Sequence, residues 1–334
     1  MTNDHVIRTA RDLLLATLAP LVAESPAIAL LDFPSHGNVG DSAIWLGALA
    51  ALRAVGAPPP AYTCDADTYD RNALARAVGH GTILLLGGGN FGDLWERHQL
   101  FRERVVADFP RNRIVQLPQS VHFQRADALA RARAVFDAHE RLTLLVRDAG
   151  SLDVVRREFR ATSHLVPDIA MTLGPLARSA PAARDILWLK RADQEDCWPG
   201  EPAPCDGDVE DWLNEERTPL IRWSDRLRYE AGMRPWLRPV GWPLLAMTHH
   251  RLSTQRLARG VNLLSSARVI VTDRLHGHIV SLLLGIPHVV LDNSYGKLHR
   301  FVAAWTSASP LVKLAQSPAE ATAHARAMLR AADG

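Results

Sequence analysis

Apolar and polar positions alternate in blocks along most of the chain. Short runs rich in Ile, Leu and Val are typical of strands buried on both faces of a sheet, and they occur at residues 27–33, 82–86, 114–117, 142–146, 164–166, 185–189, 220–223, 269–271 and 288–291. Longer stretches with helical spacing of apolar residues separate them, at 43–55, 94–107, 127–139, 151–159, 252–265 and 279–284. Regular alternation of strands and helices predicts an α/β fold with mostly parallel sheets.

The chain is expected to divide into two α/β units. Its 334 residues are more than one core usually serves, and the regular pattern breaks down at 174–181, where glycine and proline gather. We therefore expect a first domain over residues 1–175 and a second over residues 182–305. Residues 306–334 are expected to form a helical tail that could pack back on the first domain.

Composition excludes several classes of protein. A net charge of +2 gives no reason to expect nucleic acid as a partner. No apolar run approaches the roughly 20 residues that a membrane-spanning helix needs, and charged residues interrupt the first 19 residues, which resemble an amphipathic helix more than a signal peptide. The three cysteines, at positions 64, 197 and 205, form no C-x-x-C pair, so we expect reduced thiols and a cytoplasmic location.

The strand at 269–271 leads into the most informative stretch of the sequence. Arg274, His276, Gly277 and His278 lie between this strand and the helix that follows. The carboxyl end of a strand in an open α/β sheet is where ligands bind, and the helix N-terminus adds N–H groups suited to phosphate or carboxylate. We therefore predict a chemical centre at Arg274 and His276. His276 could instead cap or pack the helix, and a metal pair with His278 would lack a nearby carboxylate or cysteine ligand.

Two glycine-containing loops follow strands in the first half of the chain. Residues 35–42 contain Gly37 and Gly40, and residues 87–93 begin with three consecutive glycines. The first loop lacks the G-x-G-x-x-G spacing, so a dinucleotide site is not expected there. Its glycines either turn the chain or allow a ligand to approach the backbone, and Asp41 or Ser42 is expected to cap the following helix.

Tryptophan is concentrated in the irregular region that follows the predicted strand at 185–189. Five of the nine tryptophans lie between residues 192 and 243, at positions 198, 212, 223, 236 and 242. Such rings either pack beneath long loops or form a surface on which sugars stack. Both interpretations remain open from the sequence.

Seven short motifs together resemble the polysaccharide pyruvyl transferase family. In chain order they are residues 37–41 (GNVGD), 87–93 (GGGNFGD), 118–120 (PQS), 147–148 (RD), 167–168 (PD), 190–193 (KRAD) and 273–277 (DRLHG). The resemblance implies two Rossmann-like domains facing across a cleft, as in the GT-B architecture. It also implies transfer of pyruvyl from phosphoenolpyruvate to a sugar of a polysaccharide or lipid-linked oligosaccharide precursor, forming a pyruvate ketal without a cofactor.

The proposed chemistry assigns roles to individual residues. Phosphoenolpyruvate carries a carboxylate and a phosphate, both of which suit the planar fork of arginine, and ketal formation requires a group that both gives and takes a proton, which suits histidine. We expect His276 and Arg274 to be catalytic, His276 with a neutral imidazole because it lies at the positive end of a helix. Donor binding is expected from Arg191, Arg274, Arg147 and Gly277, and acceptor binding from Asn38, Asp41, Asn90 and Asp93. Which residue is acid and which is base stays open.

Two other functions are compatible with the pattern. One is a GT-B glycosyltransferase that uses a nucleotide sugar, and the other is a non-catalytic protein of the same fold that binds a glycan or nucleotide. Because lipid-linked sugars are assembled at the inner face of the cytoplasmic membrane, peripheral association with that face is also expected. The sequence does not reveal the surface that would dock there.

Overall fold

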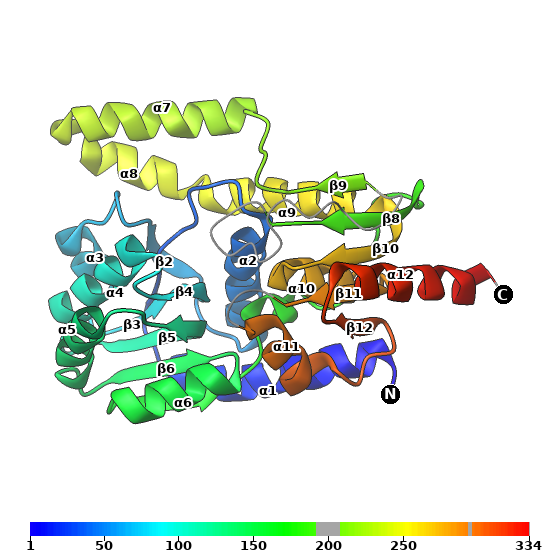
Figure 1. Ribbon diagram of the computed structural model, residues 1–334. Helices are drawn as coiled ribbons and strands as arrows, with labels where there is room; N and C mark the ends of the chain where they lie inside the picture. Colours follow the sequence, from blue (N-terminus) through cyan, green and yellow to red (C-terminus); the bar gives the residue numbers. More distant parts are fainter. Residues whose placement is uncertain (192–207, 293–295, 334) are drawn as a thin grey trace.

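The computed structural model describes residues 1–191, 208–292 and 296–333 and has two parallel sheets (Figure 1). The strands of the first sheet are β1 (Ile28–Leu31), β2 (Pro60–Cys64), β3 (Thr82–Leu85), β4 (Gly88–Gly92), β5 (Arg113–His122), β6 (Leu142–Val146) and β7 (Thr162–Leu165). Those of the second are β8 (Arg184–Leu189), β9 (Asp208–Glu210), β10 (Ala267–Thr272), β11 (His288–Leu291) and β12 (Val312–Ala315). Every pairing between neighbouring strands of the described residues is parallel, which confirms the predicted α/β class.

The order of strands in each sheet determines where a ligand can bind. The first sheet runs β2-β1-β3-β5-β6-β7, with β4 paired on β5, and the second runs β9-β8-β10-β11-β12. In both sheets the chain changes direction of travel across the sheet after the second strand, so switch points lie between β1 and β3 and between β8 and β10. Ligands of open α/β sheets bind outside the carboxyl ends of the strands at such points.

Helices cover the sheets and fill the space between them. They are α1 (Asn3–Val22), α2 (Val39–Ala54), α3 (Arg71–Val78), α4 (Glu96–Asp108), α5 (Ala126–Asp137), α6 (Ala149–Glu158), α7 (Pro219–Met233), α8 (Arg238–Ala246), α9 (His249–Ser265), α10 (Leu275–Leu283), α11 (Lys297–Phe301) and α12 (Pro318–Asp333). Short 3-10 helices lie at η1 (Ile169–Leu173) and η2 (Pro235–Leu237), and a π-helix lies at η3 (Val302–Thr306).

Helix α2 lies between the two sheets and joins their cores (Figure 1). It packs against η1 of the first half and against α9 and α10 of the second. Close approach depends on small residues: a Cβ on Gly47 would lie 2.4 Å from the carbonyl oxygen of Ile169, and one on Gly260 of α9 would lie 2.3 Å from Val39 Cγ1. One cluster of buried apolar side chains therefore extends through both sheets. It holds the two sheets in a position in which the carboxyl ends of their strands face each other.

Several elements differ from the sequence-based expectation. The strand predicted at 220–223 is the start of helix α7, where the Thr218 hydroxyl accepts from the Ile221 N–H and Pro219 occupies the first turn. The glycines of the second loop form strand β4. The cap of α2 is Asn38, whose Oδ1 accepts from the Gly40 N–H, so the prediction of Asp41 or Ser42 was wrong.

The C-terminal segment belongs to the second sheet. Residues 312–315, which were expected to lie in a helical tail, form β12 beside β11. Helix α12 packs on β10, β11 and β12, with Ala321 and Ala325 buried against that sheet. The predicted boundary at residue 305 therefore cuts through the second unit. Across the described residues, none of the helices combines the length and apolar character required to cross a membrane.

Candidate active site

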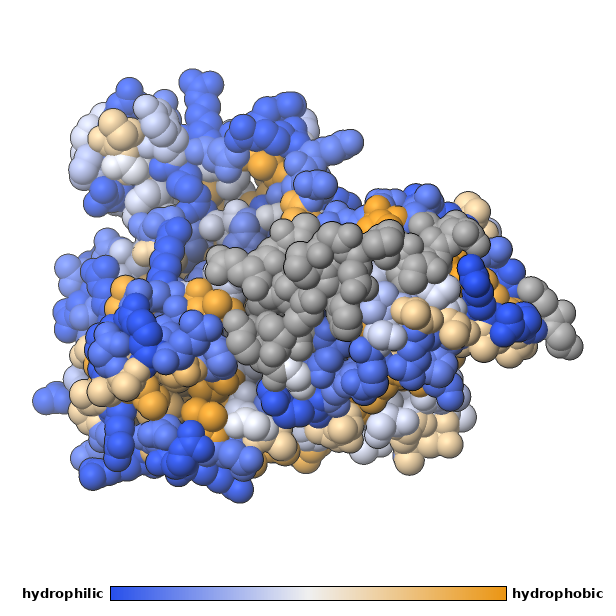
Figure 2. Space-filling model, viewed as in Figure 1, coloured by the Kyte–Doolittle hydropathy of each residue, from blue (hydrophilic) through white to orange (hydrophobic). Residues whose placement is uncertain are grey.

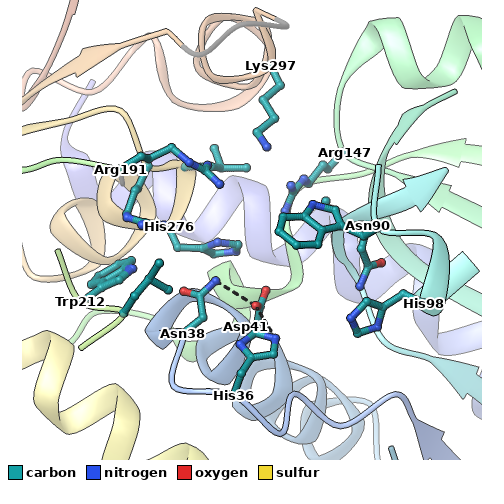
Figure 3. A pocket seen from close by; sticks show the side chains of 15 residues that line it. His36, Asn38, Asp41, Asn90, His98, Arg147, Arg191, Trp212, His276 and Lys297 are labelled. Carbon is teal, nitrogen blue, oxygen red and sulfur yellow. Dashed lines mark hydrogen bonds and ion pairs between the residues drawn. The ribbon is translucent and has the colours of Figure 1, made fainter. Parts of the chain in front are cut away.

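A cavity lies between the carboxyl edges of the two sheets, beside both switch points. Its volume is about 350 Å³, and Figure 3 shows side chains from both halves of the chain converging on it. The segments after β1 and β6, strand β4 and the segment that follows it form one side, and the segments after β8, β9, β10 and β11 form the other. The lining residues are His36, Asn38, Asp41, Gly89, Asn90, Trp95, His98, Arg147, Arg191, Trp212, Leu213, Arg274, Leu275, His276 and Lys297.

The structure brings together seven of the predicted site residues and leaves two outside. Asn38, Asp41, Asn90, Arg147, Arg191, Arg274 and His276 all line the cavity. Asp93 and Gly277 do not line it and have roles in the fold. The carboxylate of Asp93 accepts from the backbone N–H groups of Gln124 (2.8 Å) and Arg125 (2.6 Å). A Cβ on Gly277 would lie 2.4 Å from Thr272 Oγ1, so this glycine allows α10 to pack on β10.

His276 faces a buried carboxylate supplied by the other half of the chain. Its Nε2 lies 3.5 Å from Asp168 Oδ2, and the same oxygen accepts from Arg147 Nη1 at 2.5 Å. Burial alone would raise the pKa of Asp168, but His276 and then Arg147 outweigh it and hold that pKa far below its usual value. The Asp168 side chain is therefore an anion that positions both partners. The prediction for His276 considered only the helix dipole and did not include this carboxylate.

The ring of His276 is also positioned by the absence of a side chain at Gly40. A Cβ at this position would lie 2.6 Å from His276 Nδ1 and 2.7 Å from Cγ. We expect Gly40→Ala to displace the ring and to reduce turnover by roughly 10²-fold, the usual effect of a misplacement of about 1 Å. Steady-state kinetics and circular dichroism of the variant test this expectation. Gly232→Ala is the control, because a Cβ there meets no atom within 4 Å, and equal activity of the two variants would contradict the prediction.

His278 points away from the cavity. It is fully buried, with Nδ1 2.7 Å from His288 Nε2 and Nε2 3.0 Å from Thr306 Oγ1. Burial holds the pKa of this imidazole well below its usual value, so the ring is neutral. His276 and His278 therefore do not share a ligand, and His278 is part of the core.

Four cationic side chains surround the same space. Arg147 comes from the loop after β6, Arg191 and Arg274 follow β8 and β10, and Lys297 starts α11 after β11. Figure 3 labels three of them, Arg147, Arg191 and Lys297. Arg274 Nη2 donates to Asp211 Oδ2 at 2.6 Å, which orients its guanidinium group. Such a concentration of positive charge in a small cavity favours a ligand with more than one anionic group. Sequence reasoning assigned no role to Lys297, although its place beyond the end of a predicted strand was a signal.

Asp273 adds a buried carboxyl group beneath this cluster. Its Oδ1 accepts from the Arg191 N–H at 2.8 Å, whereas its Oδ2 is buried and has no hydrogen-bond partner among the residues that the structure describes. Burial raises the pKa of Asp273 to about 6, and the Arg191 N–H and the charges of Arg191 and Arg274 offset only part of that effect.

Asp273 should make stability fall as pH rises. Its folded pKa lies above the unfolded value of about 3.9, so the folded state binds the extra proton between these two values. The contribution is fully present below about pH 4 and is lost as pH rises through about 6. We expect Asp273→Asn to remove about 2–3 kcal/mol of pH dependence between pH 4 and 7.5. Urea unfolding at several pH values measures this, and parallel profiles for the variant and the parent protein would refute it.

A second histidine–aspartate pair lies on the opposite wall. Asp32 directly follows β1, and both its oxygens contact His98 Nδ1, at 2.9 and 3.0 Å. Although burial lowers the pKa of His98, the hydrogen bond and charge of Asp32 outweigh it and raise that pKa. Asp32 has a φ of 70°, a conformation that costs a non-glycine residue about 1–3 kcal/mol and occurs mainly at functional sites. This pair was not predicted, although Asp32 ends a predicted strand.

The polar residues of the first half form a pre-arranged surface beside this pair. Asn90 Oδ1 accepts from Arg102 Nη2 at 2.8 Å and Gln119 Nε2 at 2.7 Å, which fixes the orientation of the amide at the cavity wall. Asn38 Nδ2 donates to Asp41 Oδ2 at 2.9 Å, as Figure 3 shows. Fixed short polar groups of this kind are suited to hydroxyl-rich ligands.

The tryptophans singled out in the sequence lie in different environments. Trp212 is buried in the core and also reaches the cavity wall, whereas Trp236 is exposed and Trp242 lines a separate groove. Residues 192–193 of one motif, Trp198, and two of the three cysteines lie outside the described residues. Cys64 is buried and free.

Comparisons with known proteins identify a matching family, two relatives and a protein with a similar fold. Residues 38–295 match the model of a family described as polysaccharide pyruvyl transferase. The chain is 32% identical to pyruvyl transferase 1 of Schizosaccharomyces pombe, over 83% of this chain and 69% of that protein. It is 31% identical to the putative pyruvyl transferase EpsO of Bacillus subtilis, over 90% and 92%. A functionally uncharacterised protein from Klebsiella pneumoniae has a similar fold, with a TM-score of 0.59 and 15% identity over 95% of this chain and 100% of that one.

Proposed function

The chain belongs to the polysaccharide pyruvyl transferase family, and from this premise we propose that it transfers the pyruvyl group of phosphoenolpyruvate to a sugar of a polysaccharide or lipid-linked oligosaccharide precursor. The product would be a pyruvate ketal, with release of phosphate. One observation carries the proposal: four cationic side chains and a histidine paired with a buried carboxylate share one cavity. The two facing parallel sheets that form this cavity also support the GT-B arrangement.

The cations are suited to the donor. Phosphoenolpyruvate brings a phosphate and a carboxylate, and a guanidinium group forms two parallel hydrogen bonds with either. Arg191, Arg274 and Lys297 belong to the second half of the chain, so we place the donor against that side. Arg147 reaches the cavity from the first half, where its bond to Asp168 also links it to His276.

The histidines are suited to the proton transfers. Two sugar hydroxyl groups form C–O bonds with the enol carbon, the terminal CH₂ becomes CH₃ by gaining a proton, and the C–O bond to phosphate breaks. In the net reaction, one of the two hydroxyl protons accounts for the proton gained by the methyl group, and the other leaves with phosphate. His276 can deliver the proton to the terminal CH₂ of the donor, because it lies with the cations that hold the donor. His98, on the opposite wall, can accept a proton from the sugar.

The acceptor is placed against the first half of the chain. Asn38, Asp41 and Asn90 offer hydrogen-bond donors and acceptors to sugar hydroxyls at the cavity wall. Trp95 and Trp212 line the same cavity and provide flat apolar surface for a pyranose ring. Donor and acceptor would thus meet between the two sheets.

A product assay tests the proposal. Purified protein is incubated with a panel of glycosides and lipid-linked sugars, once with phosphoenolpyruvate and once with nucleotide sugars, phosphate release is measured, and products are analysed by mass spectrometry. We expect phosphate release together with a pyruvylated sugar. Consumption of a nucleotide sugar without ketal formation would identify a glycosyltransferase instead. Binding of phosphoenolpyruvate in calorimetry, with no turnover on any acceptor, would identify a non-catalytic binding protein.

A further inference from the structure

Helices α7 and α8, joined by η2, form a helical hairpin that projects from the body of the protein (Figure 1). The two helices pack on each other through small residues, with a Cβ on Gly241 falling 2.8 Å from Ala231 Cβ. An ion pair from Arg228 to Asp65 connects α7 to the first half of the chain. None of residues 219–246 lines the active-site cavity, so the catalytic proposal does not explain why the hairpin is there.

The hairpin tip, defined here as residues 229–240, exposes large apolar side chains. Tyr229 and Met233 are each 65% exposed, Trp236 is 74% exposed, and Val240 is 63% exposed. Figure 2 shows the hairpin as a lobe set apart from the body by a notch, with pale and orange residues among blue ones. Side chains of this size normally lie in the interior, so their grouping on one projection indicates a surface that becomes covered.

This grouping is specific to the hairpin. The structure describes twelve strongly exposed large apolar side chains, and seven of them lie between residues 223 and 247. The other five are scattered over the chain, as isolated surface apolar residues normally are. On α7, Tyr229 and Met233 share a face with Arg222 and Arg226, because the spacing 222, 226, 229 and 233 follows the helical repeat, and Ile221, Ser224 and Ala231 bury the opposite face.

The charge of the hairpin is positive. Residues 219–246 contain five arginines and two acidic residues, whereas the whole chain has a net charge of only +2. The two acidic residues are already paired, Asp225 with Arg217 and Glu230 with Arg234. The positive charge of Arg222 and Arg226 is therefore not balanced by acidic residues of α7.

These features match one kind of partner. Tryptophan and tyrosine rings prefer the headgroup level of a bilayer, aliphatic side chains enter its apolar layer, and arginines attract anionic lipids. We propose that the hairpin tip docks the protein on an anionic phospholipid bilayer. This inference goes beyond the proposed transfer reaction and does not depend on it. If both hold, docking would bring the active site close to lipid-linked acceptors.

Vesicle sedimentation tests the proposal. We expect the full chain to sediment with vesicles that contain phosphatidylglycerol, to bind phosphatidylcholine vesicles much more weakly, and to dissociate as salt increases. The double variant Met233→Ser/Trp236→Ser should bind anionic vesicles at least about tenfold more weakly, since it removes apolar side chains that enter the bilayer. Arg222→Glu/Arg226→Glu should also weaken binding, most strongly at low salt.

Matched controls distinguish binding through this surface from nonspecific binding of the protein to vesicles. Leu13→Ser/Leu100→Ser changes two exposed apolar residues elsewhere, and Arg8→Glu/Arg330→Glu makes the same charge change on other helices. Both controls should bind as the parent protein does, and every variant should keep its turnover on a soluble acceptor. Equal loss of binding in the controls, or absence of binding to anionic vesicles, would overturn the proposal. Tip-dependent self-association would instead assign the surface to a second copy, and tip-dependent binding of free glycan would assign it to sugar.

Discussion

Replacing His276 by alanine should lower the single-turnover rate by about two to four orders of magnitude, the usual contribution of a positioned acid or base. Donor affinity should change little, because the four cations of the cavity remain in place. The protein should stay folded, since the ring lies at the cavity wall, where it contacts Asp168 and the backbone at Gly40. Rapid-quench kinetics and calorimetry with phosphoenolpyruvate measure the two effects separately.

The control for this prediction is His80→Ala. His80 is an exposed histidine in the turn between α3 and β3 and does not line the cavity, so its replacement should leave both rate and affinity unchanged. Loss of donor binding in His276→Ala with the chemical step intact would show that His276 holds the donor and that another group moves the proton. His98 would then be the residue to test next, because Asp32 raises its pKa on the opposite wall.

Much of the fold could be predicted because the signals are local. The strand predicted at 142–146 agrees with β6, because five consecutive apolar or β-branched residues are typical of a strand buried on both faces of a parallel sheet. The carboxyl ends of those strands then indicated where Arg147, Arg191 and Arg274 would meet. The strand predicted at 220–223 was wrong because a short apolar run fits a buried strand and a helix face equally well. The Thr218–Pro219 start signal decided the outcome.

The missing parts of the site depend on contacts between distant residues. Asp168 lies 108 positions before His276 and caps η1, so nothing in its local sequence distinguishes a helix cap from the partner of a histidine. His98 lies on α4 and reaches Asp32 only after the sheet has formed. Asp93 illustrates the opposite error, since a conspicuous acidic residue in a motif proved to bind backbone N–H groups. Motif membership identified residues near the site but not what each one contacts.

Asp168→Asn should be the most destabilising single change at the site. The carboxylate is fully buried and bonds to Arg147, which is only 2% exposed. Removing one partner of a buried ion pair leaves an uncompensated charge, which typically costs 3–5 kcal/mol, so we expect a loss of about this size in the free energy of unfolding at pH 7. Because the folded pKa of Asp168 is lowered, its contribution is fully present above about pH 4 and is lost as pH falls through the folded value.

Further variants determine whether loss of the Arg147–Asp168 ion pair causes the expected fall in the free energy of unfolding. Asp225→Asn removes the partner of Arg217 in an exposed ion pair, and it should cost no more than about 1 kcal/mol. In the double variant Arg147→Met/Asp168→Asn the stranded cation is gone, so part of the stability should return relative to Asp168→Asn alone. Turnover should not return, because the double variant still lacks the carboxylate that faces His276 and also lacks one of the four cations. Urea unfolding of the parent protein, Asp168→Asn, Arg147→Met alone and the double variant gives the coupling energy. A coupling energy near zero would mean that Asp168 stabilises the fold mainly through its bond to the Ala170 N–H and that its link to Arg147 serves the site alone.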